Sequence, residues 1–210
     1  MTNPGSQPPR PGISGGSAAD AMRSLAGSRV LVGVTGGIAA YKTAMLVSRL
    51  AQAGAEVTVA MTESATKFVA PLTFQSLSGR PVYTSPWDHL ESSDPQHISL
   101  AKGLRAAIVA PCTMDCLAQL ATGRTNDVVT LILSAVDRKQ TPVLLAPAMN
   151  TVMWEQPSTR RNVATLVADG FELVGPGDGW QACRNVGAGR MVEPEDLLTA
   201  VANAAARAGR

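Results

Sequence analysis

Short apolar runs that alternate with segments of helical periodicity are the feature that most constrains this fold. Predominantly apolar runs occupy residues 30–34, 56–61, 106–110, 142–146 and 171–174, with a minor run at 82–83. Helical spacing of apolar residues covers 38–53, 64–77, 98–102, 113–121, 127–136, 158–168 and 195–206. Strands buried on both faces of a sheet produce such runs. The alternation therefore predicts an α/β fold, in which helices cover both faces of a parallel sheet.

The chain divides into a short amino-terminal segment and one longer domain. Residues 1–28 are rich in Pro, Gly and Ser and lack apolar periodicity, so we expect a disordered tail there. The regular pattern predicts a single domain over residues 29–207, in keeping with a 210-residue chain. Residues 175–190 include five glycines, and we expect them to form a loop that could cover a bound ligand.

Charge and hydropathy exclude several classes of function. Lys and Arg number 18 and Asp and Glu number 16, a net charge of +2, whereas nucleic-acid-binding proteins usually carry a clear basic excess. No apolar run approaches the roughly 18 residues that cross a bilayer, and no secretory signal is recognisable in the first 28 residues. We therefore expect a cytoplasmic protein with neither a membrane nor a nucleic-acid partner.

The cysteines do not form a metal-binding pattern. Cys112 and Cys116 lie four residues apart, but the histidines, His89 and His97, both precede them and no second pair completes a zinc site. We expect no bound metal. An odd number of cysteines in such a chain favours reduced thiols.

Polar residues follow four of the apolar runs, where parallel sheets bind ligands. They lie at residues 35–37, 62–64, 111–113 and 147–150. Thr35, Gly36, Gly37 and Ile38 could hold a phosphate on free backbone amides, although a plain strand-to-helix turn is the alternative.

The type of nucleotide is also constrained. The chain lacks the Gly-x-Gly-x-x-Gly of dinucleotide sites and the glycine spacing of a nucleoside-triphosphate loop before Lys42. The hydroxyls of Thr62 and Ser64 suit a terminal phosphate, which favours a mononucleotide, whereas Glu63 could still serve a ribose hydroxyl.

Three further residues have both a functional and an ordinary interpretation. His97 precedes a short helical turn and could be a base or a solvated side chain. Asn150 could donate to a carboxylate at the ligand edge or cap a helix. Cys183 lies in the glycine-rich loop, as a participant in chemistry or as an incidental thiol, whereas Cys112 and Cys116 look like packing residues.

Five short sequence strings resemble the homo-oligomeric, flavin-dependent cysteine decarboxylase family. They occur in the same order as in that family, and the resemblance covers about residues 29–205. They are Gly-Val-Thr-Gly-Gly-Ile-Ala-Ala-Tyr-Lys (33–42), His-Ile-Ser-Leu-Ala (97–101), Ala-Pro-Cys-Thr (110–113), Pro-Ala-Met-Asn-Thr-Val-Met-Trp (147–154) and Gln-Ala-Cys-Arg-Asn-Val-Gly-Ala-Gly-Arg-Met (181–191).

The resemblance implies a Rossmann-like (flavodoxin-like) fold, FMN as cofactor, and assembly as homotrimers or as dodecamers of trimers. It implies decarboxylation of 4′-phosphopantothenoylcysteine to 4′-phosphopantetheine in coenzyme A biosynthesis, through thioaldehyde and ene-thiolate intermediates. His97 would be the base and Cys183 the late proton donor. The implied substrate-binding residues are Asn150, Met153, Ala182 and Gly187. The implied FMN-binding residues are Thr35, Gly36, Gly37, Ile38, Thr62, Ser64, Pro111, Cys112, Thr113, Met114 and Ala148.

Two strings depart from the family's usual pattern and leave alternatives open. Cys183 is followed by Arg184-Asn185 instead of Gly-Asp, and residues 111–115 read Pro-Cys-Thr-Met-Asp instead of Pro-Ala-Thr/Ser-Ala-Asn. The alternatives are a decarboxylase that acts on peptides ending in cysteine, with the same His97 and Asn150, and a flavin-binding regulatory or prenyl-transferring relative without decarboxylase activity.

Overall fold

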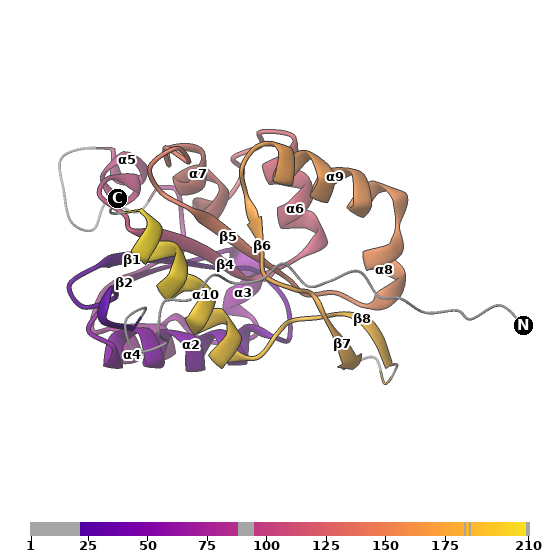
Figure 1. The fold of residues 1–210 in the computed structure, drawn as a ribbon, viewed down its shortest axis with the longest axis horizontal. Helices are drawn as coiled ribbons and strands as arrows, with labels where there is room; N and C mark the ends of the chain where they lie inside the picture. Colours follow the sequence, from indigo (N-terminus) through magenta and orange to yellow (C-terminus); the bar gives the residue numbers. More distant parts are fainter. Residues whose placement is uncertain (1–21, 88–94, 183, 185, 209–210) are drawn as a thin grey trace, which may run out of the picture.

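A six-stranded parallel sheet forms the centre of the molecule in the computed structural model, which describes residues 22–87, 95–182, 184 and 186–208 (Figure 1). The strand order is β3-β2-β1-β4-β5-β6. This is the Rossmann order, in which the chain reverses direction across the sheet between β1 and β4. The predicted α/β fold is confirmed. The strands are β1 (Arg29–Val34), β2 (Glu56–Met61), β3 (Val82–Tyr83), β4 (Ala106–Cys112), β5 (Val143–Pro147) and β6 (Glu172–Leu173).

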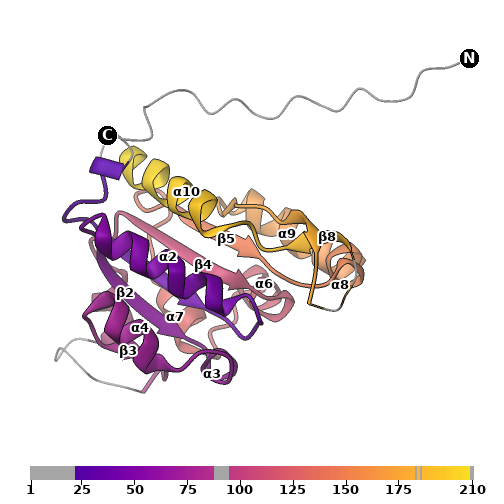
Figure 2. The same ribbon diagram turned by 90° about the horizontal axis from the view of Figure 1, so that it is seen from below.

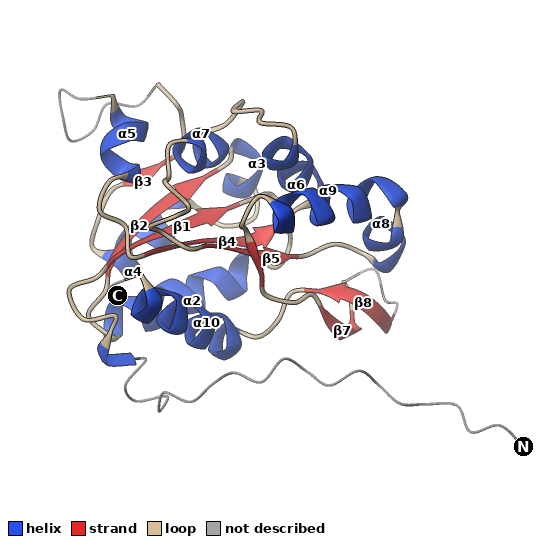
Figure 3. Ribbon diagram, turned by 45° about the horizontal axis from the view of Figure 1, so that its top comes forward, coloured by secondary structure: helices blue, strands red, loops and turns tan. Residues whose placement is uncertain are grey.

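Helices cover both faces of the sheet because side chains alternate along each strand. Val30, Val32 and Val34 of β1 belong to one buried cluster, and Leu31 belongs to the other. The first cluster packs under α2 (Ala40–Gln52), α4 (Pro71–Ser78) and α10 (Pro194–Arg207). The second packs under α5 (Gln96–Ala101), α6 (Met114–Ala121), α7 (Val128–Ser134) and α9 (Pro157–Ala168). Figures 2 and 3 show these two layers.

The helix expected over residues 64–77 is two helices in the structure. A short α3 (Glu63–Thr66) ends before Ala70, and α4 begins at Pro71. Proline lacks the N–H that a continuing helix would need, and it drives the preceding residue into an extended conformation, as Ala70 shows with ψ of 142°. Pro71 is therefore the first residue of a helix, where it is well tolerated.

The glycine-rich segment is more ordered than predicted. Residues expected to form a loop contain an antiparallel hairpin of β7 (Gly177–Trp180) and β8 (Val186–Arg190). Figure 3 shows this hairpin beyond the carboxyl end of the sheet, beside α8 (Thr151–Glu155). The hairpin was missed because its strands alternate glycine with other residues and have no apolar face.

The ordered domain begins earlier than the predicted boundary at residue 28. Leu25 is 0 % exposed and belongs to the first buried cluster. Ser24 Oγ donates a hydrogen bond of 3.1 Å to the carbonyl of Ala202 in α10. The prediction of a disordered tail is therefore wrong for residues 22–28, and residues 1–21 lie outside the described part of the chain.

Among the described residues, no helix is long and apolar enough to cross a membrane. No three His, Cys, Asp or Glu side chains in the same ranges lie close enough together to hold a metal ion.

We predict that Leu25→Ala lowers the free energy of unfolding by about 2–5 kcal/mol, because it leaves a cavity in the core. Chemical denaturation measures this change. Leu72→Ala is the control: Leu72 is 68 % exposed, so its truncation should change stability by no more than about 0.5 kcal/mol. Equal effects of the two substitutions would contradict the revised domain boundary.

Candidate functional site

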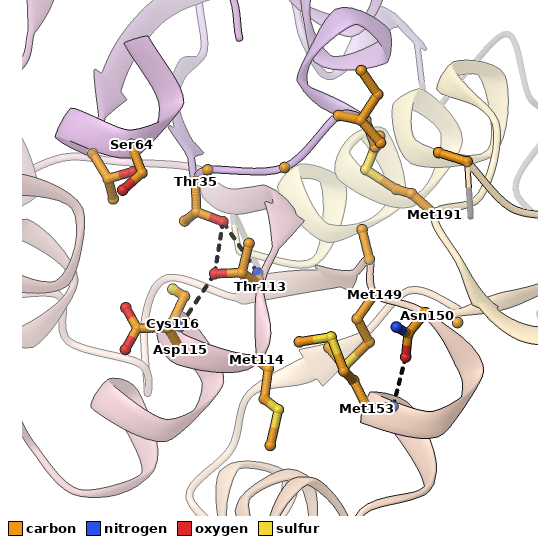
Figure 4. A pocket seen from close by; sticks show the side chains of 18 of the residues that line it. Thr35, Ser64, Thr113, Met114, Asp115, Cys116, Met149, Asn150, Met153 and Met191 are labelled. Atoms are coloured by element: carbon orange, nitrogen blue, oxygen red, sulfur yellow. Dashed lines mark hydrogen bonds between the residues drawn. The ribbon is translucent and has the colours of Figure 1, made fainter. Parts of the chain in front are cut away.

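One cavity of about 980 Å³ lies at the carboxyl ends of β1, β2, β4 and β5 (Figure 4). Its volume is at the upper end of the range for ligand sites, about 300–1,000 Å³. The turns after these strands form its floor, and the β7–β8 hairpin contributes Trp180, Gln181 and Ala182. This is the edge at which doubly wound sheets bind ligands.

The hydroxyl of Thr35 joins the turns that follow β1 and β4. Thr35 is 1 % exposed, and its Oγ1 donates to the carbonyl of Pro111 at 2.6 Å. The same oxygen accepts from the backbone N–H of Thr113 at 3.1 Å. Thr113 Oγ1 in turn accepts from the N–H of Cys116 at the start of α6. Both hydroxyls therefore position backbone at the cavity floor.

Gly36 is required by the close approach of the turn after β2. A Cβ built on Gly36 would lie 2.4 Å from Cβ of Ser64, a distance that real side chains do not adopt. Thr62 Oγ1 accepts from the N–H of Ala65 at 3.2 Å and thereby caps α3. The Gly36–Gly37 backbone and Ser64 together line one end of the cavity, where a phosphate could bind.

Asn150 lies at the other end of the cavity, where it caps a helix and keeps its amide donor unused among the described residues. Its Oδ1 accepts from the N–H of Met153 at 2.8 Å and caps α8, so the helix-capping interpretation is correct. Because the oxygen makes this bond, the Nδ2 amide is left as the donor toward a ligand. Figure 4 shows Asn150 beside Met149 and Met153, across the cavity from the Thr35 turn.

Ionic contacts fix the carboxyl-terminal end of the hairpin to α2. Lys42 is buried, and its Nζ donates to Glu193 Oε1 at 2.9 Å and to the carbonyl of Met191 at 3.3 Å. Arg190 pairs with the same carboxylate. The hydrogen bond from Lys42 lowers the pKa of Glu193, which keeps this carboxylate ionised at neutral pH.

Most of the residues predicted to bind a ligand line this cavity. They are Thr35, Gly36, Gly37, Ile38, Thr62, Ser64, Thr113, Met114, Ala148, Asn150, Met153 and Ala182. Pro111 lies behind the floor, 3.6 Å from a Cβ built on Gly37. Cys112 is fully buried, and its carbonyl accepts from the N–H of Ala148. Gly187 packs against Thr151 instead of lining the cavity, and Cys183 lies outside the described residues.

His97 lies near the amino-terminal ends of the strands, opposite the end of the sheet that carries the cavity. It lies on α5, whose neighbouring carbonyls of Ser99 and Lys102 accept from the guanidinium of Arg29. Arg29 begins β1 and the cavity follows its end, a separation of about 17 Å along the strand at roughly 3.3 Å per residue. The structure therefore does not bring His97 and Asn150 of one chain together.

Cys112 and Cys116 have the surroundings of packing residues. They are 0 % and 2 % exposed and belong to the second buried cluster. A hydrogen bond with Cys112, together with burial, raises the pKa of the Cys116 thiol well above its usual value. A neutral thiol is a poor nucleophile, which agrees with the packing interpretation, although Cys116 does border the cavity.

Several residues that line the cavity were not predicted. They include Tyr41, Lys42, Asp115, Gln119, Met149, Trp180, Gln181, Arg190 and Met191. Tyr41, Lys42, Met149, Gln181, Arg190 and Met191 lie within the strings that carry the family resemblance, which is the one signal that could have identified them. Their position at the cavity depends on tertiary packing of α2 and the hairpin.

Comparison with known proteins identifies relatives along most of the chain. The family described as Flavoprotein matches residues 19–206. The coenzyme A biosynthesis bifunctional protein CoaBC of Vibrio vulnificus (strain YJ016) is 46 % identical over 177 residues, which cover 84 % of this chain and 43 % of that protein. CoaBC of Escherichia coli (strain K12) is 44 % identical over 175 residues, 83 % of this chain and 42 % of the relative. This chain thus spans less than half the length of these curated relatives.

Solved structures share the fold. A PPC decarboxylase mutant complexed with pantothenoylaminoethenethiol is 30 % identical with a TM-score of 0.75, covering 83 % of this chain and 96 % of that chain. The FMN-dependent cysteine decarboxylase SpaF is 26 % identical with a TM-score of 0.74, covering 89 % and 99 %. The FMN-binding protein AtHal3 is 30 % identical with a TM-score of 0.71, covering 82 % and 93 %.

The capping role of Asn150 can be tested by stability measurements. We predict that Asn150→Ala lowers the free energy of unfolding by about 0.5–2 kcal/mol, because the N–H of Met153 loses its acceptor. Asn150→Asp should leave stability nearly unchanged, because a carboxylate oxygen caps a helix equally well. Urea denaturation of both variants measures this, and an equal loss of stability in the two would contradict the capping geometry.

Proposed function

This chain belongs to the flavoprotein family, and on that premise we propose that it is an FMN-dependent decarboxylase acting on 4′-phosphopantothenoylcysteine. The product would be 4′-phosphopantetheine, an intermediate of coenzyme A biosynthesis. One observation carries the proposal: one cavity has the Gly36–Gly37 turn and Ser64 at one end, where a phosphate could bind, and the Nδ2 amide of Asn150 at the other. The identity to the CoaBC proteins supports the same assignment.

The residues at the cavity floor fit FMN. The Gly36–Gly37 backbone and Ser64 suit its single phosphate, and the absence of a side chain at Gly36 lets Ser64 lie directly against this turn. Met114, Met149 and Met191 offer a polarizable apolar lining suited to a flavin ring. When bound, FMN would supply reversible two-electron chemistry that oxidises the substrate thiol and so makes loss of carbon dioxide possible.

Residues of the chain would bind the substrate and move its protons. Asn150 Nδ2 would donate to the substrate carboxylate, with Oδ1 held in place by the N–H of Met153. His97 would act as the base, and Cys183 would return a proton to the ene-thiolate formed after decarboxylation. Met153 and Ala182 would contact the substrate from α8 and from the hairpin.

A second copy of the chain would complete the site. His97 and Asn150 lie at opposite edges of the sheet, so both can act on one substrate when α5 of a neighbouring copy packs beside the cavity. This geometry supports a homo-oligomer, and we propose the trimer, alone or within a dodecamer, as its form. Three copies in a ring would each donate α5 to one neighbour and receive it from the other.

A decarboxylase of peptides ending in cysteine is the second candidate. SpaF, described as an FMN-dependent cysteine decarboxylase, is 26 % identical over 89 % of this chain, which supports loss of carbon dioxide from a cysteine as the chemistry that both candidates share. The two candidates differ in what occupies the cavity beyond the cysteine: a phosphorylated pantothenoyl chain or a peptide.

We predict that the purified protein is yellow, that heat releases FMN from it, and that it forms carbon dioxide from 4′-phosphopantothenoylcysteine. The cofactor is identified by chromatography, and product formation is followed by mass spectrometry. A peptide ending in cysteine is the parallel substrate. Turnover of the peptide alone would favour the second candidate, and recovery of FAD or of no flavin after reconstitution with FMN would refute the cofactor assignment.

We predict that His97→Asn and Asn150→Asp, each assayed alone, lower the rate of carbon dioxide release by about 10²–10⁴-fold and retain FMN. When the two inactive proteins are dissociated, mixed and reassembled, activity should reappear, because some interfaces then pair an intact His97 with an intact Asn150. Carbon dioxide release from the mixture measures this. The same mixing of Asn150→Asp with itself is the control, and a mixture that stays inactive would contradict a shared site.

A further inference from the structure

Gln181 makes hydrogen bonds to two elements beside the cavity, the hairpin strand β8 and the start of α8. It is buried, with 7 % of its surface exposed. Its Nε2 donates to the carbonyl of Ala188 in β8 at 2.8 Å and to Thr151 Oγ1 at 3.2 Å. It also approaches the carbonyl of Gly187 at 3.4 Å. Its Oε1 accepts from the backbone N–H of Thr151 at 3.2 Å. One side-chain amide therefore joins the hairpin to the first residue of α8.

Two glycines bring the hairpin into direct contact with the same helix start. A Cβ built on Gly187 would lie 2.5 Å from Thr151 Oγ1, and one built on Gly189 would lie 2.4 Å from the carbonyl of Met149. Met149 N–H also donates to the carbonyl of Gly189 at 2.9 Å. The hairpin backbone thus lies directly against the Thr151 side chain and the Met149 backbone, with no hairpin side chain at either contact.

The elements that Gln181 joins both carry residues of the proposed site. Thr151 follows Asn150, whose cap on Met153 depends on the orientation of the first turn of α8. Trp180 and Ala182, on either side of Gln181, line the cavity from the hairpin. A shift of one element relative to the other would change the separation of the Asn150 amide from the hairpin.

We propose that Gln181 is a positioning residue that holds the Asn150 amide and the hairpin at a fixed separation, so that both contact the same substrate. This inference rests on the proposed function. Gln181 acts through Thr151, Gly187 and Ala188 and does not itself need to touch the reacting atoms.

Only a primary amide satisfies these partners together. The N–H of Thr151 requires an acceptor, and the carbonyl of Ala188 requires a donor. An ionised glutamate would place a second acceptor against the Ala188 carbonyl. A leucine would fill a similar volume and leave both buried backbone groups unpaired, which is costlier than the loss of an exposed hydrogen bond.

The test compares Gln181→Leu with a matched control in the FMN-loaded, full-length protein. We expect Gln181→Leu to lower kcat for carbon dioxide release by about 10- to 100-fold, since small misplacements of binding groups have effects of this size. FMN content should not change. Gln156→Leu makes the same chemical change at an exposed site just beyond α8 and should keep the wild-type kcat and KM.

A double-mutant cycle separates positioning from a general loss of stability. Thr151→Val removes one acceptor of Gln181 and should have a smaller effect of the same kind. The double variant should be no worse than Gln181→Leu, because the two residues act through one contact. If the effects multiply, or if Gln181→Leu lowers the melting temperature while kcat and KM stay at wild-type values, the positioning role is wrong.

Hydrogen exchange gives a readout that does not depend on the substrate. In Gln181→Leu, amides of the hairpin and of the first turn of α8 should exchange faster together, while those of β1 keep wild-type rates. Unchanged exchange in both elements would overturn the inference even in an active enzyme. If the wild-type protein is inactive and Gln181→Leu still shows the coupled increase, the proposed function is refuted and the structural coupling stands.

Discussion

The buried hydroxyl of Thr35 holds together the turns at the carboxyl ends of β1 and β4. One oxygen donates to the carbonyl of Pro111 and accepts from the N–H of Thr113, so the turns after β1 and β4 share a fixed register. These two strands flank the point where the chain reverses direction across the sheet, which is where a doubly wound fold opens a crevice. Loss of this contact would leave buried backbone groups unpaired, and the turns of the cavity floor would no longer be held in position.

The second half of the cavity depends on a different kind of contact. Glycines at 187 and 189 allow the hairpin backbone to lie against Thr151 and Met149, and Gln181 fills the hydrogen-bonding needs that remain. Lys42 and Glu193 then fasten the end of the hairpin to α2. The Gly36–Gly37 turn and the Asn150 amide therefore belong to separate parts of the chain, and the hairpin lines the same cavity as both.

Several elements were predictable because their signals are local. The apolar runs at 30–34 and 106–110 identify strands β1 and β4, since a strand buried on both faces has no polar side. The polar turns after the strands, including Gly36 and Asn150, follow from the rule that parallel strands end at one edge. The division at Pro71 was also local, but helical spacing on both sides of it favoured one helix. The hairpin had no such signal, because alternating glycines leave no apolar face to detect.

The sequence by itself determined the strands of the parallel sheet, the ends of those strands at which polar residues collect, and the family to which the chain belongs, because periodicity and short strings are properties of neighbouring residues. Tertiary structure alone decided that the hydroxyls of Thr35 and Thr62 bind backbone, that Leu25 belongs to the core, and that Asn150 both caps α8 and presents a free amide. It also placed His97 at the far edge from Asn150. These outcomes depend on contacts between residues far apart in the chain, and no local pattern specifies which partners meet.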